Sequence, residues 1–154
     1  MTLYLVRHGS AGHRDNLDSH DQDRSLDADG RAQAEKLTKW LRHSPISQIL
    51  CSPLPRCVQT VEPLAQALNL PIQIHEALAE SADIDKSWKL LTKSGATTAV
   101  FCSHGDVIPD LIRRAQLRGL HIPGKSGCAK GSVWTLDHYN GTRFATGVYT
   151  PITP

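Results

Sequence analysis

Short apolar runs alternate with amphipathic segments along this sequence, and that alternation limits the possible folds more than any other feature. Four such runs predict strands, at 2–6, 46–51, 71–75 and 98–102. Between and after them, apolar residues recur at the spacing typical of helices. Strands that alternate with helices favour a mainly parallel sheet with helices on both faces. The predicted fold class is therefore α/β, with three layers in the order α/β/α.

Local signals predict where the helices lie. Asp27 is expected to open the first helix, because Asp is a preferred N-cap residue. The second is expected to begin near Pro53 and Pro55, since a missing N–H costs little in the first turn of a helix. A third helix is predicted at about 84–94, and a fourth after Gly105.

The last part of the chain, SVWTLDHYNGTRFATGVY, contains two alternating runs around Asn140-Gly141. This dipeptide predicts a β-hairpin with a type I′ turn, in which both central residues need a positive φ. The sheet is therefore expected to end in a C-terminal hairpin. No repeat or linker interrupts the chain, and 154 residues suit a single domain spanning residues 1–154.

Charge and composition restrict the partners and the location. A net charge of +2 does not favour nucleic acid or an anionic membrane as a partner. No apolar run approaches the ~18 residues of a membrane span, and the N-terminus lacks the features of a signal peptide, so a cytoplasmic location is expected. The four cysteines show no CxxC spacing, which favours structural thiols over a zinc site.

Polar residues follow three of the predicted strands. The first strand leads into Arg7-His8-Gly9, the second is followed by Ser52 and Arg56, and the fourth by Ser103-His104-Gly105-Asp106. The carboxyl ends of parallel strands are where ligands bind in open α/β sheets. Two arginines with planar guanidinium forks, next to helix N-termini, suit the oxygens of a phosphate group. The sequence therefore predicts a phosphate-binding site at this edge of the sheet.

Four motifs, in this order along the chain, resemble those of the histidine phosphatase superfamily: Arg7-His8-Gly9, Leu26-Asp27-x-x-Gly30-Arg31-x-Gln33-Ala34, Ser52-Pro53-x-x-Arg56-x-x-x-Thr60 and Ser103-His104-Gly105-Asp106. The short length resembles SixA-type phosphohistidine phosphatases, because there is no room for the long insertions of mutases and acid phosphatases. Segments 59–65, 107–112 and 130–134 are similar to the phosphatase-like domain of actinobacterial Nudix-fused nucleotide hydrolases. This chain lacks a Nudix half, so its substrate stays open.

The resemblance implies a phosphatase that transfers the phosphoryl group to His8 and so forms a covalent phosphohistidine intermediate. Neutral imidazole is a good nucleophile, and the transfer divides one hydrolysis into two easier steps. Arg7, Arg56 and His104 would surround the phosphoryl group and neutralise its charge, as the matching family positions do.

The resemblance also indicates a general acid for the leaving group. In the family this acid often lies in a Leu-x-Glu segment after the third strand, which Leu78-Ala79-Glu80 matches, and Glu76 is the competing residue. Substrate contacts are expected from Gly9, Ser10, Arg14, Gly105, Lys125 and Lys130, although Lys125 and Lys130 also fit a solvated loop.

No cofactor or metal is expected, because the arginines and the second histidine supply the positive charge that Mg²⁺ gives to other phosphoryl-transfer enzymes. Asp21 and Asp23 suggest a metal loop as an alternative, but such loops need more oxygen ligands. The candidate partners are a small phosphorylated substrate such as a nucleotide, or phosphohistidine on a protein. A module that binds phosphate without turnover is the other reading, and the intact set of His8, Arg7, Arg56 and His104 argues against it. The sequence does not determine the oligomeric state.

Overall fold

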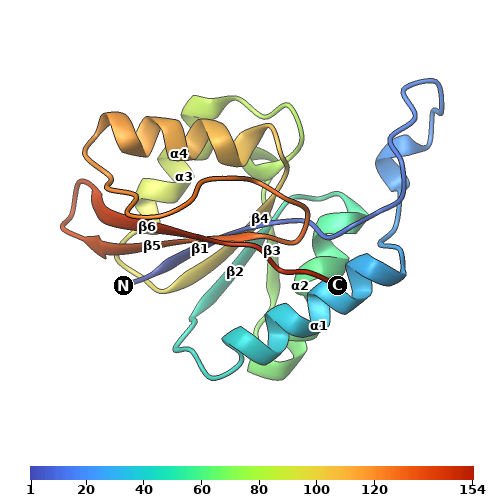
Figure 1. Cartoon of the computed structure of the whole chain (residues 1–154), viewed down its shortest axis with the longest axis horizontal. Helices are drawn as coiled ribbons and strands as arrows, with labels where there is room; N and C mark the ends of the chain where they lie inside the picture. Colours follow the sequence, from blue (N-terminus) through green and yellow to red (C-terminus); the bar gives the residue numbers. More distant parts are fainter.

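The computed structural model describes residues 1–154 and contains one six-stranded sheet with the strand order β3-β2-β4-β1-β5-β6 (Figure 1). β1 to β4 are parallel to one another, β5 runs antiparallel to β1, and β6 runs antiparallel to β5. The predicted fold class is confirmed. The strands span Leu3–Arg7 (β1), Gln48–Cys51 (β2), Ile72–Ile74 (β3), Ala99–Ser103 (β4), Val133–Tyr139 (β5) and Phe144–Thr150 (β6).

Two helices cover each face of the sheet, as Figure 1 shows. α1 (Ala28–Leu41) and α2 (Pro55–Leu68) pack on one face, and α3 (Ile84–Lys93) and α4 (Val107–Leu117) pack on the other. The sheet has an apolar core on each side because successive side chains of a strand point to opposite faces. In β1, for example, Leu3 and Leu5 belong to the core under α4, whereas Val6 belongs to the core under α1 and α2.

The predicted helix starts are confirmed in detail. The Asp27 side chain caps α1 by accepting a hydrogen bond of 2.9 Å from Gly30 N, and Pro55 is the first residue of α2. The side chains of Asp83 and Asp106 also cap their helices: Asp83 accepts from Asp85 N at the start of α3, and Asp106 accepts from Val107 N at the start of α4. An N-cap side chain satisfies one of the backbone N–H groups that the first turn leaves without a partner. These short-range contacts fix where α1, α3 and α4 begin.

The hairpin is present, but its predicted turn is wrong by one residue. Tyr139 pairs with Phe144, and Asn140 N donates to Arg143 O at 3.0 Å, so Gly141 and Thr142 form the tip. A type I′ turn centred on Asn140 and Gly141 would require a positive φ at both residues. Gly141 has a φ of 100°, but Asn140 does not have a positive φ. The Asn140 side chain instead accepts hydrogen bonds from the N–H groups of Thr142 and Arg143, which holds it at the first position of the turn.

The carboxyl ends of β1, β2 and β4 meet at one edge of the sheet, on the right in Figure 1. The loop between β1 and α1 leaves the sheet there and projects away from it, with a short 3₁₀ helix at Asp21–Asp23. No helix of the structure is both long enough and apolar enough to cross a membrane. Cys51, Cys57 and Cys102 are fully buried free thiols, and Cys128 is half-buried.

Candidate active site

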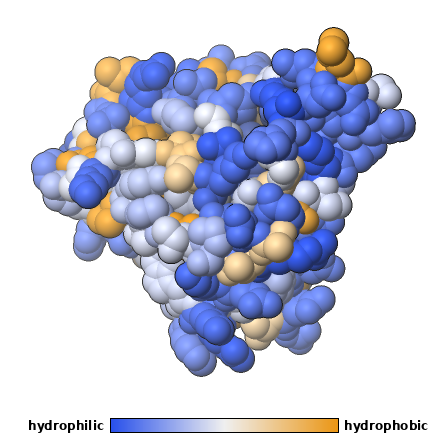
Figure 2. Space-filling view, turned by 45° about the vertical axis from the view of Figure 1, so that its right-hand side comes forward, coloured by the Kyte–Doolittle hydropathy of each residue, from blue (hydrophilic) through white to orange (hydrophobic).

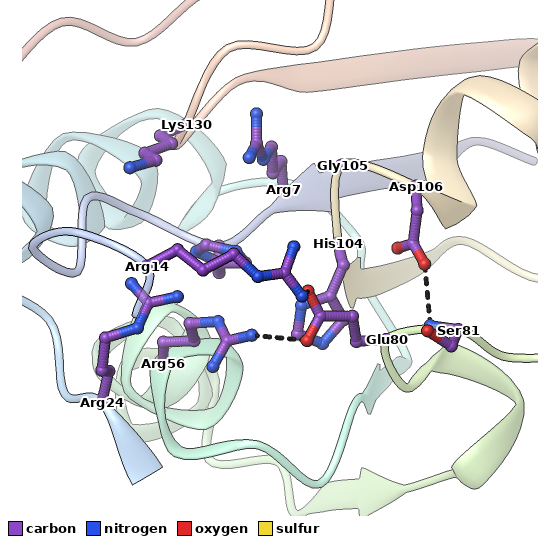
Figure 3. A pocket seen from close by; sticks show the side chains of 11 residues that line it. Arg7, Arg14, Arg24, Arg56, Glu80, Ser81, His104, Gly105, Asp106 and Lys130 are labelled. Carbon is purple, nitrogen blue, oxygen red and sulfur yellow. Dashed lines mark hydrogen bonds and ion pairs between the residues drawn. The ribbon is translucent and has the colours of Figure 1, made fainter. Parts of the chain in front are cut away.

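A polar cleft of about 490 Å³ opens at this edge of the sheet, beside the ends of β1 and β4. Figure 2 shows that the side of the molecule facing this edge is mostly hydrophilic, and Figure 3 shows the residues of the cleft. None of the lining residues is hydrophobic; they are Arg7, His8, Arg14, Arg24, Arg56, Glu80, Ser81, His104, Gly105, Asp106 and Lys130.

His8 follows β1 directly and is 5% exposed. Its Nδ1 lies 2.8 Å from the carbonyl oxygen of Gly9. Because a carbonyl only accepts, Nδ1 carries the proton of this hydrogen bond, and Nε2 is the nitrogen left with a lone pair. The pKa of His8 is lowered to about 3, mainly because burial disfavours the charged imidazolium, and the nearby charges of His104, Arg56 and Arg7 add to the effect. His8 is therefore neutral at physiological pH.

His104 follows β4, the strand beside β1, and is 1% exposed. Its ring centroid lies 5.2 Å from that of His8, and the two rings are inclined at 60°. Nε2 of His104 lies 2.8 Å from Ser52 Oγ and 3.4 Å from Cys57 Sγ. Its Nδ1 is buried and has no hydrogen-bond partner. Neighbouring strands thus bring both histidines to one cleft, and each ring keeps one nitrogen without a protein partner.

Arg7 and Arg56 line the same cleft as these histidines. Arg7 Nη1 donates to the Cys128 carbonyl at 2.7 Å, and its guanidinium lies against Gly105 so closely that an added Cβ would be 2.7 Å from Cζ. Arg56, in the first turn of α2, is only 1% exposed. The Nε atoms of both arginines are buried without a hydrogen-bond partner. Both side chains are held in place and keep a donor free.

Glu80 is an anion among these cations. Its Oε2 lies 3.2 Å from Arg56 Nη2, and its Oε1 lies 2.9 Å from Arg14 Nη2, so one carboxylate pairs with two guanidinium groups. Glu76, the competing candidate for the general acid, opens the 3₁₀ helix at Glu76–Leu78 and does not line the cleft. The structure therefore brings Glu80, and not Glu76, to the two histidines.

Hydrogen bonds behind the cleft tie its loops together. The Thr60 hydroxyl accepts from Gly9 N at 2.9 Å and donates to Arg56 O at 2.6 Å, so one side chain joins the loop after β1 to α2. Ser10 Oγ donates to Asp27 Oδ2 at 2.7 Å, and this bond is the main reason that the pKa of Asp27 falls to about 2. Gly9 and Ser10 thus belong to the framework that positions His8.

Most of the predicted site residues line the cleft. All five predicted catalytic residues do so, together with Arg14, Gly105 and Lys130. Gly9 and Ser10 are not part of the lining, and Lys125 is exposed and also outside it. The roles of all these residues stay predictions.

Three lining residues were not predicted to belong to the site: Arg24, Ser81 and Asp106. Arg24 is held by Asp21 at 2.9 Å and by the Ala11 carbonyl at 2.7 Å. Its position depends on the conformation of the loop between β1 and α1, and no sequence motif predicts that conformation. Asp106 belongs to a recognised motif, but only the fold shows what it contacts.

The lining is strongly cationic. Its four arginines and Lys130 carry five positive charges, against the two carboxylates of Glu80 and Asp106. Such a concentration of charge in a cleft attracts anions. Asp21, a candidate metal ligand, is paired with Arg24, and no group of three or more His, Cys, Asp or Glu side chains is close enough to hold a metal ion.

Comparison with known proteins identifies the family of this chain. The chain belongs to the histidine phosphatase superfamily (branch 1), which residues 3–83 match. Over 97% of its length it is 35% identical to the 8-oxo-(d)GTP phosphatase of Mycolicibacterium smegmatis, and it spans 48% of that protein. It is also 28% identical to the phosphohistidine phosphatase SixA of Escherichia coli, over 73% of this chain and 72% of SixA.

Solved structures show the same fold. The structure of the protein histidine phosphatase SixA complexed with tungstate superposes with a TM-score of 0.75 and 21% identity, and the superposition covers 100% of this chain and 97% of that one.

Proposed function

We propose that this protein is a metal-independent phosphatase that transfers a phosphoryl group from its substrate to Nε2 of His8 and then to water. The observation that carries the proposal is the state of His8: Nδ1–H is bound to the Gly9 carbonyl and the pKa is about 3. The ring is therefore neutral and presents a lone pair on Nε2 to a cationic cleft. A neutral imidazole in this tautomer is the nucleophile that in-line phosphoryl transfer needs.

The surrounding donors stabilise the charge of the transferring group. The buried side-chain polar atoms without a hydrogen-bond partner are Arg7 Nε, Arg56 Nε and His104 Nδ1, and all three belong to this cleft. Buried polar groups without a partner are rare in folded proteins, and a bound phosphoryl group would supply the missing acceptors. Donors already in place cost no reorganisation during the reaction, and removing one typically costs about 3–4 kcal/mol of barrier lowering.

Glu80 acts as the general acid in this proposal. In the structure its carboxylate is the counter-ion of Arg56 and Arg14. A phosphoryl group bound to Arg56 takes over that place. The Glu80 carboxylate, now beside an anion, takes up a proton from the substrate monoanion or from water and faces the leaving group. The bond between phosphorus and the leaving oxygen breaks as the bond to Nε2 of His8 forms, and the Glu80 proton goes to that oxygen. In the second step the water oxygen attacks phosphorus, the bond between phosphorus and Nε2 of His8 breaks, and Glu80 takes the proton of the water. Phosphate is released, and neutral His8 and protonated Glu80 are restored.

The charge of the cleft favours a substrate with more than one anionic group, such as a nucleoside di- or triphosphate. Arg7 and Arg56 already match a single phosphoryl group, and Arg14, Arg24 and Lys130 add three further cations. The name of the M. smegmatis relative, an 8-oxo-(d)GTP phosphatase, points the same way. The name of the E. coli relative supports phosphohistidine on a protein as the second candidate.

The test is to trap the intermediate. The enzyme is mixed with p-nitrophenyl phosphate or a nucleoside diphosphate and quenched in alkali, which preserves phosphohistidine, and the phosphorylated peptide is identified by mass spectrometry. We expect phosphate on His8, and no turnover by His8→Ala with a retained circular dichroism spectrum. Phosphate on another residue, or substantial activity of the variant, refutes the proposal. Phosphate binding by the wild type without turnover of any nucleotide, ester or phosphohistidine peptide would identify a binding module.

A further inference from the structure

Asp106 connects the loop that carries Glu80 to the segment that carries His104. It is the N-cap of α4, and its Oδ1 accepts a hydrogen bond of 2.9 Å from Val107 N. Its second oxygen, Oδ2, accepts a hydrogen bond of 2.7 Å from the backbone N–H of Ser81, which Figure 3 shows as a dashed line. Ser81 is the residue after Glu80. One carboxylate thus completes a helix cap and also holds the loop beside the candidate acid.

The backbone at Ser81 needs such a partner. Ala82 N donates to Ala79 O at 3.1 Å, so Glu80 and Ser81 are the two central residues of a tight turn. Ser81 has a φ of 63°, in the left-handed region that residues other than Gly, Asn and Asp seldom adopt. A rotation of this residue back to negative φ would turn the neighbouring peptide group and move the Glu80 side chain. The hydrogen bond to Asp106 opposes that rotation because it fixes the Ser81 N–H.

A second contact holds the other side of the loop. Ser103 Oγ, at the end of β4, donates to the Leu78 carbonyl at 2.7 Å, and both residues are buried. Ser103 and Asp106 flank His104 and Gly105 in the sequence. The loop of Glu80 is therefore anchored at both ends to the four residues that place His104 in the cleft. The position of the carboxylate relative to the reacting groups depends on these two anchors.

We propose that Asp106 is a positioning residue for Glu80: through the Ser81 N–H it holds the Glu80 carboxylate where it can protonate the leaving group. This inference rests on the proposed role of Glu80 as the general acid. A misplaced acid matters most for a strongly basic leaving group, such as an alkoxide, and little for p-nitrophenolate, which leaves without a proton. Loss of Asp106 should therefore lower activity more strongly when the leaving group is more basic.

The test uses Asp106→Ser, because the serine hydroxyl can still cap α4 but is too short to reach Ser81 N. We measure kcat/KM for glycerol 2-phosphate and p-nitrophenyl phosphate, which reports transfer to His8. We expect Asp106→Ser to lower the first value by roughly ten- to a hundredfold, as a misplacement of about 1 Å does, and the second by less than about threefold. Asp110→Ser is the matched control. It also removes a carboxylate from the first turn of α4, but Asp110 does not line the cleft. It should leave both values unchanged.

Glu80→Gln and the double variant complete the experiment. Glu80→Gln should show the same dependence on the leaving group with a larger loss, about a hundredfold or more. Adding Asp106→Ser to Glu80→Gln should cause no further loss, because the positioned group is already gone. Equal losses on both substrates, losses that multiply in the double variant, or an unchanged Asp106→Ser overturn the positioning role while the role of Glu80 stands. A uniform effect of Glu80→Gln overturns the acid assignment, and the inference with it. If Asp106→Ser fails to fold, Asp106→Asn, whose single oxygen cannot serve both N–H groups, must show the same pattern.

Discussion

Acid should destabilise this protein through His8, because the folded chain holds that imidazole in its neutral form. The pKa of His8 is lowered from 6.5 to about 3 in the folded state, chiefly by burial. In the unfolded chain the imidazole is in water and binds a proton near its ordinary pKa. Between these two values the unfolded state binds more protons than the folded state. Stability is therefore complete above about pH 6.5 and is lost as the pH falls towards 3.

The size of the effect follows from the difference between the two pKa values. One unit corresponds to about 1.36 kcal/mol, and pH 4.5 lies about two units below the unfolded value, so His8 alone lowers the free energy of unfolding by about 2.7 kcal/mol at that pH. That is a large share of the roughly 5–15 kcal/mol by which domains of this size are stable.

Urea unfolding of the wild type and of His8→Gln at about pH 7.5 and pH 4.5 measures this contribution, with m-values checked for constancy. Between the two pH values the wild type should lose about 2–3 kcal/mol more stability than His8→Gln, because glutamine does not titrate. His13→Gln removes an exposed imidazole from the loop after β1 and is the matched control, which should behave like the wild type. An equal loss in His8→Gln and the wild type would show that His8 is not held neutral and would refute the reasoning.

Three shorter predictions concern the cationic cleft and its backbone. Activity should survive EDTA unchanged, because Arg7 and Arg56 supply the charge that a metal ion gives elsewhere; a loss that a divalent ion restores would contradict this. Gly105→Ala places a Cβ 2.7 Å from Arg7 Cζ and should lower kcat/KM about ten- to a hundredfold with a nearly unchanged Tm, so full activity would show that Arg7 is not needed where it lies. Gly30→Ala places a Cβ 2.1 Å from the Ser10 carbonyl oxygen and should cost about 1–3 kcal/mol in urea unfolding; wild-type stability would contradict that clash.

The fold was predictable where short-range signals and strand patterns agree. Asp27 and Pro55 mark helix starts through contacts within one turn, so the sequence alone places them correctly. Asn140 illustrates the limit. Its dipeptide with Gly141 favours a two-residue turn, but the pairing of β5 with β6 sets the register and moves the tip one residue along. Pairing over a whole strand outweighs the preference of one turn.

The candidate site was predictable where a motif follows a strand. His8 and His104 come directly after β1 and β4, so a correct sheet is enough to bring them together. Ser81 and Arg24 reach the cleft through contacts between distant segments, with Asp106 in one case and with the Ala11 carbonyl in the other. No periodicity or motif spacing in the sequence predicts that Ser81 or Arg24 lines the cleft. Such residues appear only when the loops are folded.

The pairing of β1 with β4 also bears on how this protein could be redesigned. Arg7 is paired with Ser103, and His8 N donates to Ser103 O at 3.1 Å, so the separation of the two histidines is set by the register of neighbouring strands. A strand can shift only by whole residues, about 3.3 Å each, and every odd step turns its side chains to the other face. The distance between His8 and His104 therefore cannot be adjusted in small steps by moving the strands. The loop segment at 13–23, which carries Arg14, and the side chain of Lys130 have no such restriction. An engineer seeking a new substrate would vary these and keep the sheet and the contacts that hold His8 and Arg7.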